Sequence, residues 1–153
     1  MPRAGATRCL ALGASAPRRS TAANTARFTA AELAYLLDEP RLGRLATADA
    51  TGAPHVVPVG WTLNTALGTI DVSGRRSAAT RKYRNVTANP RAALVVDDVL
   101  PPFRPRSVLV QGHAHALAAD HSTGTEALIR IVPEKITSWG LDTDLPTRSR
   151  HTG

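Results

Sequence analysis

Hydrophobic residues recur along the chain with two successive periods, first that of a helix and then that of strands. Leu33, Leu36 and Leu37 have the i, i+3, i+4 spacing of an α-helix. Residues 29–32 match a capping box, in which a threonine begins the helix and a glutamate lies three positions later. Pro40 ends the pattern. The sequence therefore predicts one helix between the capping threonine and this proline.

From residue 44 onward the hydrophobic period shortens to two, which is typical of half-buried strands. Pro58 lacks an N–H group, so the strand that contains it should lie at a sheet edge or carry a bulge. Gly112 should bend the longest strand. The predicted strands span residues 44–48, 55–63, 69–73, 92–97, 107–117 and 128–132, the last continuing through 134–139. Six strands and two short helices predict a mainly β fold, a small barrel or roll with helical trim.

The second helix is predicted over residues 78–87, with Ser77 as its cap, and it lies in the most basic stretch of the chain. No acid occurs between Asp71 and Asp97. A glycine turn followed by a helix N-terminus offers backbone N–H groups to an anion, and Arg81 and Lys82 could close over a phosphate. The alternative is a solvated basic face. The six cations are Arg75, Arg76, Arg81, Lys82, Arg84 and Arg91.

A second candidate feature is the apolar run that begins at His55. Val57, Pro58 and Val59 are followed by Gly60, which together suggest a flat apolar wall with exposed backbone groups. Such a wall suits a planar heterocycle. The alternative is a plain core strand with a proline at its edge.

Net charge is +7, but it is concentrated before residue 28. The first 27 residues hold five arginines and no acid, so the rest of the chain is nearly balanced. This distribution, with aromatic residues at only 4%, does not favour nucleic-acid binding. No apolar run approaches the ~18 residues that a membrane span needs, and one cysteine, Cys9, excludes an intramolecular disulfide. We expect a soluble, cytoplasmic protein.

Residues 1–27 show no sustained period and are expected to form a disordered basic leader. A signal peptide is the alternative, but the apolar stretch Cys9–Ala14 is shorter than the usual apolar region of one. Order is expected over residues 28–142, with a flexible tail at 143–153.

Neither a metal site nor a catalytic side chain is predicted. His113 and His115 share one strand face, but no cysteine or carboxylate completes a ligand set with them. Asp97 and Asp98 are adjacent on a strand and point to opposite faces, so they cannot act as an acid–base pair.

Four separated motifs together resemble one family. They are RLGRLAT at residues 41–47, GAPHVVPVG at 52–60, RNVTANPRAALVVDD at 84–98 and SWGL at 138–141. The chain resembles the pyridoxamine-phosphate-oxidase-like split β-barrels, which have an FMN-binding type of fold. Within them it is most similar to small reductases that use the deazaflavin coenzyme F420. Residues 129–142 are especially similar to the branch that contains dehydrotetracycline reductases.

The resemblance implies a six-stranded split barrel at residues 28–142 and a homodimer with cofactors at the subunit interface. It places the cofactor ring against the second strand, the phosphate beside the third strand and the helix after it, and Trp139 near the ring pocket. With the features found from the residues alone, the expected cofactor-binding residues are His55, Val57, Pro58, Val59, Ser73, Gly74, Arg75, Arg81, Lys82 and Trp139.

The function expected from this resemblance is F420-dependent reduction of an activated C=C bond in a small organic substrate, such as a tetracycline-type polyketide. An FMN-dependent oxidase or reductase on the same barrel is the first alternative, and six basic residues favour F420 over it. A non-catalytic protein that binds F420 or another planar ligand is the second alternative.

Overall fold

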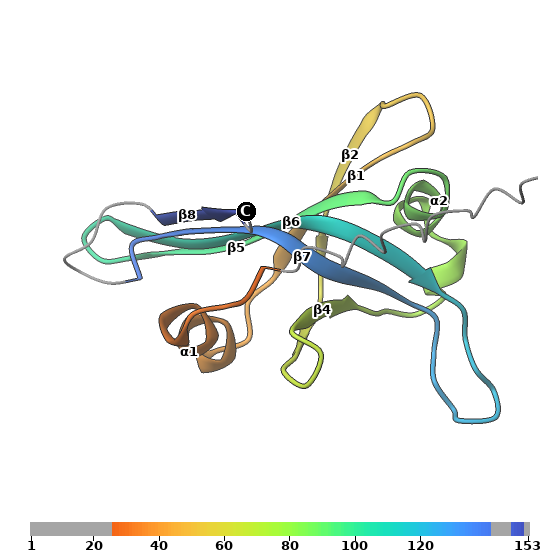
Figure 1. Ribbon diagram of the computed structural model, residues 1–153, viewed down its shortest axis with the longest axis horizontal. Helices are drawn as coiled ribbons and strands as arrows, with labels where there is room; N and C mark the ends of the chain where they lie inside the picture. Colours follow the sequence, from red (N-terminus) through yellow and green to blue (C-terminus); the bar gives the residue numbers. More distant parts are fainter. Residues whose placement is uncertain (1–25, 142–147, 152–153) are drawn as a thin grey trace, which may run out of the picture.

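The computed structural model describes residues 26–141 and 148–151, which form one antiparallel sheet with helices packed against it (Figure 1). The mainly β class is confirmed. The elements, in chain order, are α1 (Ala30–Asp38), β1 (Gly43–Ala48), β2 (Pro54–Val59), β3 (Thr62–Asn64), β4 (Thr69–Val72), the 3₁₀-helix η1 (Ser77–Ala79), α2 (Arg81–Ala88), β5 (Arg91–Leu100), β6 (Arg104–Leu117), β7 (Leu128–Trp139) and β8 (Arg148–His151).

The strands lie in the order β2-β1-β5-β6-β7-β4-β3, and β8 pairs with the outer part of β7. The described residues thus hold eight strands, where the sequence predicted six. Gly60 and Trp61 interrupt the predicted second strand and divide it into β2 and β3. The remaining strand, β8, lies in the segment that was expected to be a flexible tail, and the rest of that tail lies outside the described residues.

Alternate side chains of the sheet form the core. Leu45, Leu94, Val110 and Ile136 lie opposite one another on β1, β5, β6 and β7, and all four are fully buried. Because successive side chains point to opposite faces, the neighbouring row turns its side chains away from the core. This alternation gives the long strands one buried face and one open face.

Gly112 marks the bend that was predicted in β6. The register between β6 and β7 shifts between Gln111 and Gly112, which is a β-bulge. A Cβ atom at Gly112 would collide with the carbonyl oxygen of Val132, so the close approach of the two strands requires glycine.

Helix α1 begins as predicted, with a complete capping box. The Thr29 N–H donates to Glu32 Oε2 at 2.8 Å, and the Glu32 N–H donates to Thr29 Oγ1 at 3.4 Å. The buried Glu32 also accepts a 2.8 Å bond from Ser138 Oγ, which joins α1 to β7. The predicted apolar face was partly wrong, because Tyr35 is buried and Leu37 is 59% exposed.

Two residues before the predicted start of order, at positions 26 and 27, are part of the described structure. Ala26 is buried, and its N–H donates to the carbonyl of Pro133 on β7 at 2.8 Å. The expected disorder is therefore wrong for residues 26 and 27, while residues 1–25 lie outside the described part of the chain.

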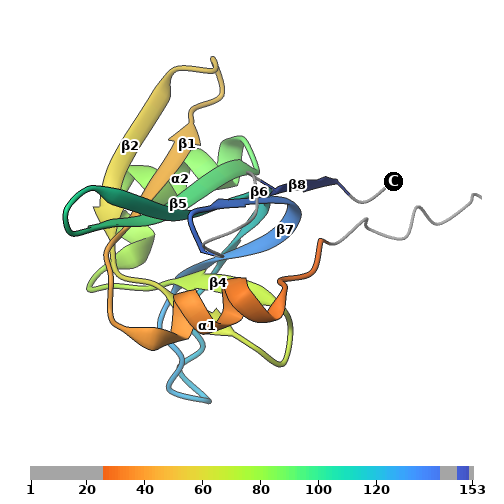
Figure 2. The same cartoon turned by 90° about the vertical axis from the view of Figure 1, so that its left-hand side faces the viewer.

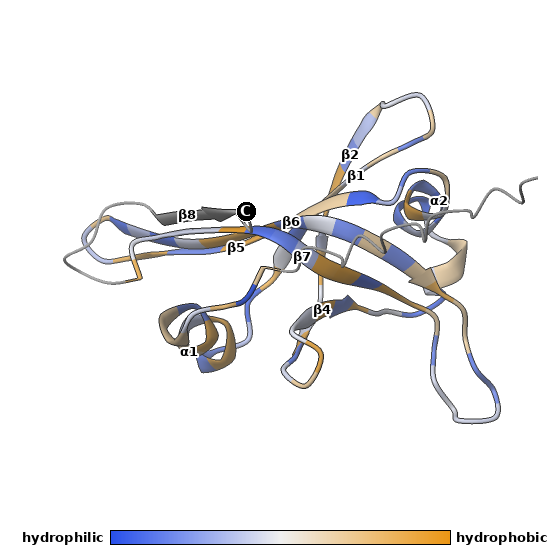
Figure 3. Cartoon of the chain, viewed as in Figure 1, coloured by the Kyte–Doolittle hydropathy of each residue, from blue (hydrophilic) through white to orange (hydrophobic). Residues whose placement is uncertain are grey.

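The two helices differ in character (Figure 3). Helix α1 is mostly hydrophobic and lies at the lower left of Figure 1, whereas the mostly hydrophilic α2 lies at the upper right. Among the described residues, no helix is long and apolar enough to cross a bilayer.

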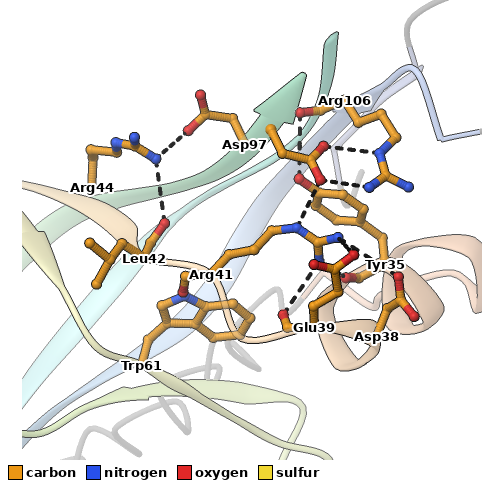
Figure 4. A network of polar contacts seen from close by, with 10 residues as sticks. Tyr35, Asp38, Glu39, Arg41, Leu42, Arg44, Trp61, Asp97 and Arg106 are labelled. Atoms are coloured by element: carbon orange, nitrogen blue, oxygen red, sulfur yellow. Dashed lines mark hydrogen bonds and ion pairs between the residues drawn. The ribbon is translucent and has the colours of Figure 1, made fainter. Parts of the chain in front are cut away.

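A polar network fixes α1 to the β5–β6 hairpin and to the end of β2 (Figure 4). Asp98 accepts hydrogen bonds from Arg106 at 2.9 and 2.6 Å and from Arg41 Nε at 2.9 Å. Both guanidinium groups also lie over the Tyr35 ring, that of Arg41 at 4.5 Å and that of Arg106 at 5.1 Å from the ring centroid. The Trp61 indole N–H donates to the Arg41 carbonyl at 2.8 Å, so the network also holds the chain just after β2.

Candidate cofactor site

Strand β2 lies at the edge of the sheet, which confirms the placement predicted from Pro58. Its partner in the sheet is β1, and its other edge leaves backbone groups unpaired by any strand in the described chain. Val57 and Val59 lie opposite Leu45 and Gly43 and face the core, whereas Pro58 faces the other side. The prediction of one flat apolar wall is therefore wrong, because the side chains of residues 57–59 alternate between the two faces of the sheet. What runs without interruption along β2 is its unpaired backbone edge.

The loop after β4 is exposed and contains the most unusual backbone of the region. Ser73, Gly74 and Arg75 are all exposed. Arg76 adopts a left-handed conformation with φ 56° and ψ 36°, which is uncommon for a residue with a side chain. Such outliers concentrate at functional sites, and αR–αL turns can bring backbone N–H groups together around an anion.

Helix α2 begins later than predicted. Ser77 starts the 3₁₀-turn η1, and Thr80 caps α2 by accepting from the Tyr83 N–H at 3.4 Å. Arg81 and Lys82 are thereby the first two residues of the helix, and its first turn holds no acid. Cations at a helix N-terminus are electrostatically unfavourable unless an anion lies among them.

Within the described residues, five of the six predicted cations form no ion pair. The exception is Arg91, which binds Glu134 at 2.9 Å from the first position of β5. Lys82 is half-buried, and the other four are exposed. The unpaired cations are Arg75, Arg76, Arg81, Lys82 and Arg84.

A buried hydrogen bond places α2 beside the N-terminal half of β2. Asn85 Nδ2 donates to Thr47 Oγ1 at 3.0 Å, and Thr47 lies opposite His55. Directly opposed side chains point to the same face, so His55 lies on the side of the sheet that α2 covers. The Nδ1 atom of His55 is buried and has no hydrogen-bond partner in the described structure.

The turn between β1 and β2 also lies near the start of α2. Hydrogen bonds from Thr51, and from the backbone N–H groups of Ala53 and Thr51, lower the pKa of Asp49, and the positive charge of Arg81 lowers it further. The pKa of Asp49 is therefore lowered mainly by the hydrogen bonds of its own turn, and Arg81 contributes the smaller part.

Trp139 lies apart from the other predicted residues. It is at the last position of β7, opposite Ser107, while β1, β5 and β6 separate β7 from β2. Figure 1 shows this end of β7 at the left and α2 at the right. In a single chain the Asn85–Thr47 hydrogen bond brings α2 beside the His55 end of β2, whereas Trp139 lies away from both.

Two further groups of titratable side chains, the adjacent aspartates of β5 and the two histidines of β6, form no catalytic or metal site in the described structure. Asp97 binds Arg44 at 2.7 Å, and Asp98 belongs to the α1 network, so both carboxylates form ion pairs with arginines. The His113 and His115 rings lie 4.7 Å apart, but the described residues contain no cluster of three metal-ligating side chains.

Ser77 is a member of the site that the sequence did not single out as a binding residue. Its side chain is buried, and its Oγ atom lacks a hydrogen-bond partner among the described residues. A buried hydroxyl without a hydrogen-bond partner costs free energy, so the position of Ser77 between the basic loop and α2 suits a hydrogen bond to a bound ligand. Its position after Gly74 and before the helix was a usable signal, but it predicted only a cap.

Comparison with known proteins agrees with this architecture. The sequence profile of the family described as pyridoxamine 5'-phosphate oxidase matches residues 29–151, most of the chain. The chain belongs to the pyridoxamine 5'-phosphate oxidase family. The resemblance inferred from the four motifs is thus confirmed.

Proteins similar to this family member include two that are named as reductases and one that is named as FAD-binding. A 5a,11a-dehydrotetracycline/5a,11a-dehydrooxytetracycline reductase of Streptomyces rimosus is 41% identical over 126 residues, 78% of this chain and 88% of that protein. The crystal structure of an FAD-binding protein from Mesorhizobium loti has 25% identity and a TM-score of 0.55, covering 72% of this chain and 92% of the other. A solved F420 reductase has 20% identity and a TM-score of 0.51, covering 65% and 91%.

Proposed function

We propose that this protein is an F420-dependent reductase that transfers a hydride to an activated C=C bond of a small organic molecule. The observation that carries the proposal is the group of unpaired cations around the β4–η1 loop and the start of α2. A relative named as a dehydrotetracycline reductase supports the reaction class and suggests a polycyclic polyketide as substrate.

The residues present fit a phosphate-bearing planar cofactor. The left-handed Arg76, the unpaired Ser77 hydroxyl and Lys82 offer donors of the kind that a phosphate requires. The further cations at positions 75, 81 and 84 exceed what one phosphate group needs, and they suit the additional carboxylates of the F420 tail. FMN, which has a single phosphate, would leave part of this charge without a partner.

When bound, the reduced deazaflavin would supply the hydride. The chain's own part is to bind and orient it: the basic loop and α2 would hold the phosphate, and the free edge of β2 would align the ring. Val57, which is only half-buried, would keep water from one side of it. His55 lies on the same face of the sheet as α2 and has an unpaired Nδ1, so it is suited to a polar contact with the cofactor.

The proposal includes a homodimer with the cofactors at the interface. The side of β1, β2, β5 and β6 that points away from the core carries Ala46, Val56, Ala93, Val95 and Leu109. Val56 is 61% exposed. Within the described chain no helix covers this apolar face, and a second copy packed on it would bury it. The partner subunit's Trp139 could then approach the site that a single chain leaves without it.

Fluorescence titration with F420 and with FMN, followed by turnover assays, tests the proposal. We expect F420 to bind at least tenfold more tightly than FMN, and reduced F420 to be oxidised when a polycyclic enone is added. Equal affinity or a preference for FMN would favour a flavin enzyme. Tight F420 binding without oxidation by any of a panel of enones would favour a carrier.

A further inference from the structure

An apolar groove lies between α1 and the chain that follows β2. Its volume is about 570 Å³. Two leucines at its wall are conspicuously exposed, Leu37 at 59% and Leu42 at 60%. The other apolar lining side chains include Leu36, Pro40, Trp61 and Leu63.

The most exposed large apolar side chain of the described residues is Phe103, at 76%. It follows Pro101 and Pro102 in the loop between β5 and β6, and Val99 on the same hairpin is 54% exposed. Burial of one aromatic side chain contributes strongly to protein interfaces, and prolines limit the entropy lost when such a loop is ordered. The hairpin therefore presents a preorganised apolar tip that its own chain leaves uncovered.

We propose that Phe103 of one copy occupies the apolar groove of a second copy, an exchange that rests on the homodimer proposed above. The hairpin tip and α1 lie at the same end of the molecule, as Figures 1 and 2 show. A two-fold axis near that end would bring each tip to the groove of the other subunit and would form both contacts at once.

Charge at the two surfaces is complementary. Glu39 lines the groove and Asp38 directly precedes it; their side chains are 65% and 60% exposed, and they share Arg41, whose Nε already binds Asp98. The exposed Arg104 directly follows Phe103. In the dimer, Arg104 of one copy would therefore approach Asp38 and Glu39 of the other. These two acids share one cation, Arg41, which is also bound to Asp98.

The groove also adjoins the proposed cofactor site, because Gly60 and Trp61 line it and directly follow β2. A partner side chain seated there would close the end of the pocket beyond Val59. Phe103 would then help to set the size of the substrate that each site accepts, in addition to stabilising the dimer.

Sedimentation equilibrium of the full chain tests how much Phe103 and the groove contribute to the affinity of the dimer. Phe103→Ala should weaken dimerisation at least a hundredfold, since the substitution occurs twice per dimer and each contact is worth about tenfold. Leu37→Ser should weaken it as well, and the double variant should lose less than the sum of the two effects. Leu117→Ala, at a residue 37% exposed on the other hairpin, is the matched control and should leave dimerisation unchanged. Additive effects, or unchanged dimerisation of Phe103→Ala, would overturn the proposal.

Photocrosslinking identifies what occupies the groove. Chains with Phe103→p-benzoylphenylalanine are mixed with isotope-labelled chains, so that mass spectrometry separates crosslinks between copies from those within one. We expect crosslinks from position 103 to residues 36–42 or 60–63 of the other copy. Crosslinks to the chain's own groove, or to any other surface of a dimer, would overturn the exchange alone. A wild-type protein that sediments as a monomer would overturn the proposed dimer as well.

Discussion

Lys82→Ala should change cofactor affinity and stability in opposite directions. Lys82 is the second residue of α2, half-buried, and without an ion pair in the described structure. A cation in the first helical turn costs about 0.3–1 kcal/mol against the helix dipole. Its removal should therefore leave the cofactor-free protein slightly more stable, with Tm raised by roughly 1–3 °C for a domain of this size.

The same substitution should weaken cofactor binding, because a charge-assisted contact to phosphate is worth roughly 1.5–3 kcal/mol. The expected loss in affinity is about ten- to a hundredfold. Turnover at saturating cofactor should change little, since the ring is aligned by β2 rather than by α2. Ligand-free thermal melts, fluorescence titration and saturating kinetics on one preparation measure all three quantities.

Arg91→Ala is the matched control, because Arg91 belongs to the same basic stretch but is paired with Glu134 on the sheet. Loss of this exposed pair should cost no more than about 1 kcal/mol of stability and should leave cofactor affinity almost unchanged. Equal losses of affinity for the two variants would show that the region acts as a diffuse positive surface. A lowered Tm of Lys82→Ala with unchanged affinity would show that Lys82 serves the fold.

Three further predictions concern the framework of the site. Burial, reinforced by the charge of Asp98, raises the pKa of Tyr35 to about 12. Between pH 10 and 12 the unfolded chain therefore loses the phenolic proton while the folded chain keeps it, so the free energy of unfolding falls as pH rises. Tyr35→Phe should remove up to about 2–3 kcal/mol of this loss of stability, measured by denaturant titration across pH. Asp98→Asn should lower Tm by roughly 2–8 °C and shift Trp61 fluorescence through Arg41, and an unchanged emission spectrum would contradict the coupling. A chain that starts at Phe28 should melt about 2–4 °C below one that starts at Ala26, because it lacks the buried alanine and its bond to β7; equal melting temperatures would refute this.

Local signals identified most elements, and the errors arose where tertiary contacts decide. Ser77 and Thr80 each offer a hydroxyl that can cap a helix, and sequence alone predicted the earlier one. The phase of α2 is fixed instead by the burial of Asn85 and Val86 against the sheet. Leu37 fits the apolar period of α1 as well as Leu36 does, but the position of the sheet exposes it.

The candidate site was predictable where its residues are consecutive and uncertain where they come from different strands. The basic loop and the start of α2 form one continuous segment, so their proximity follows from the sequence. Trp139 and β2 are far apart in the chain, and the sequence does not say that three strands separate them. The open face of the sheet, likewise, depends on which side α2 covers.

The prolines of β2 have a consequence for solubility. A free strand edge normally invites other chains to add strands, which leads to aggregation. Pro54 and Pro58 remove the N–H groups at two positions of this six-residue edge, and their rings hinder the approach of another backbone. A small planar molecule can still reach the carbonyl and amide groups that remain between them. The edge can therefore stay open to a ligand while a competing peptide strand finds an interrupted ladder.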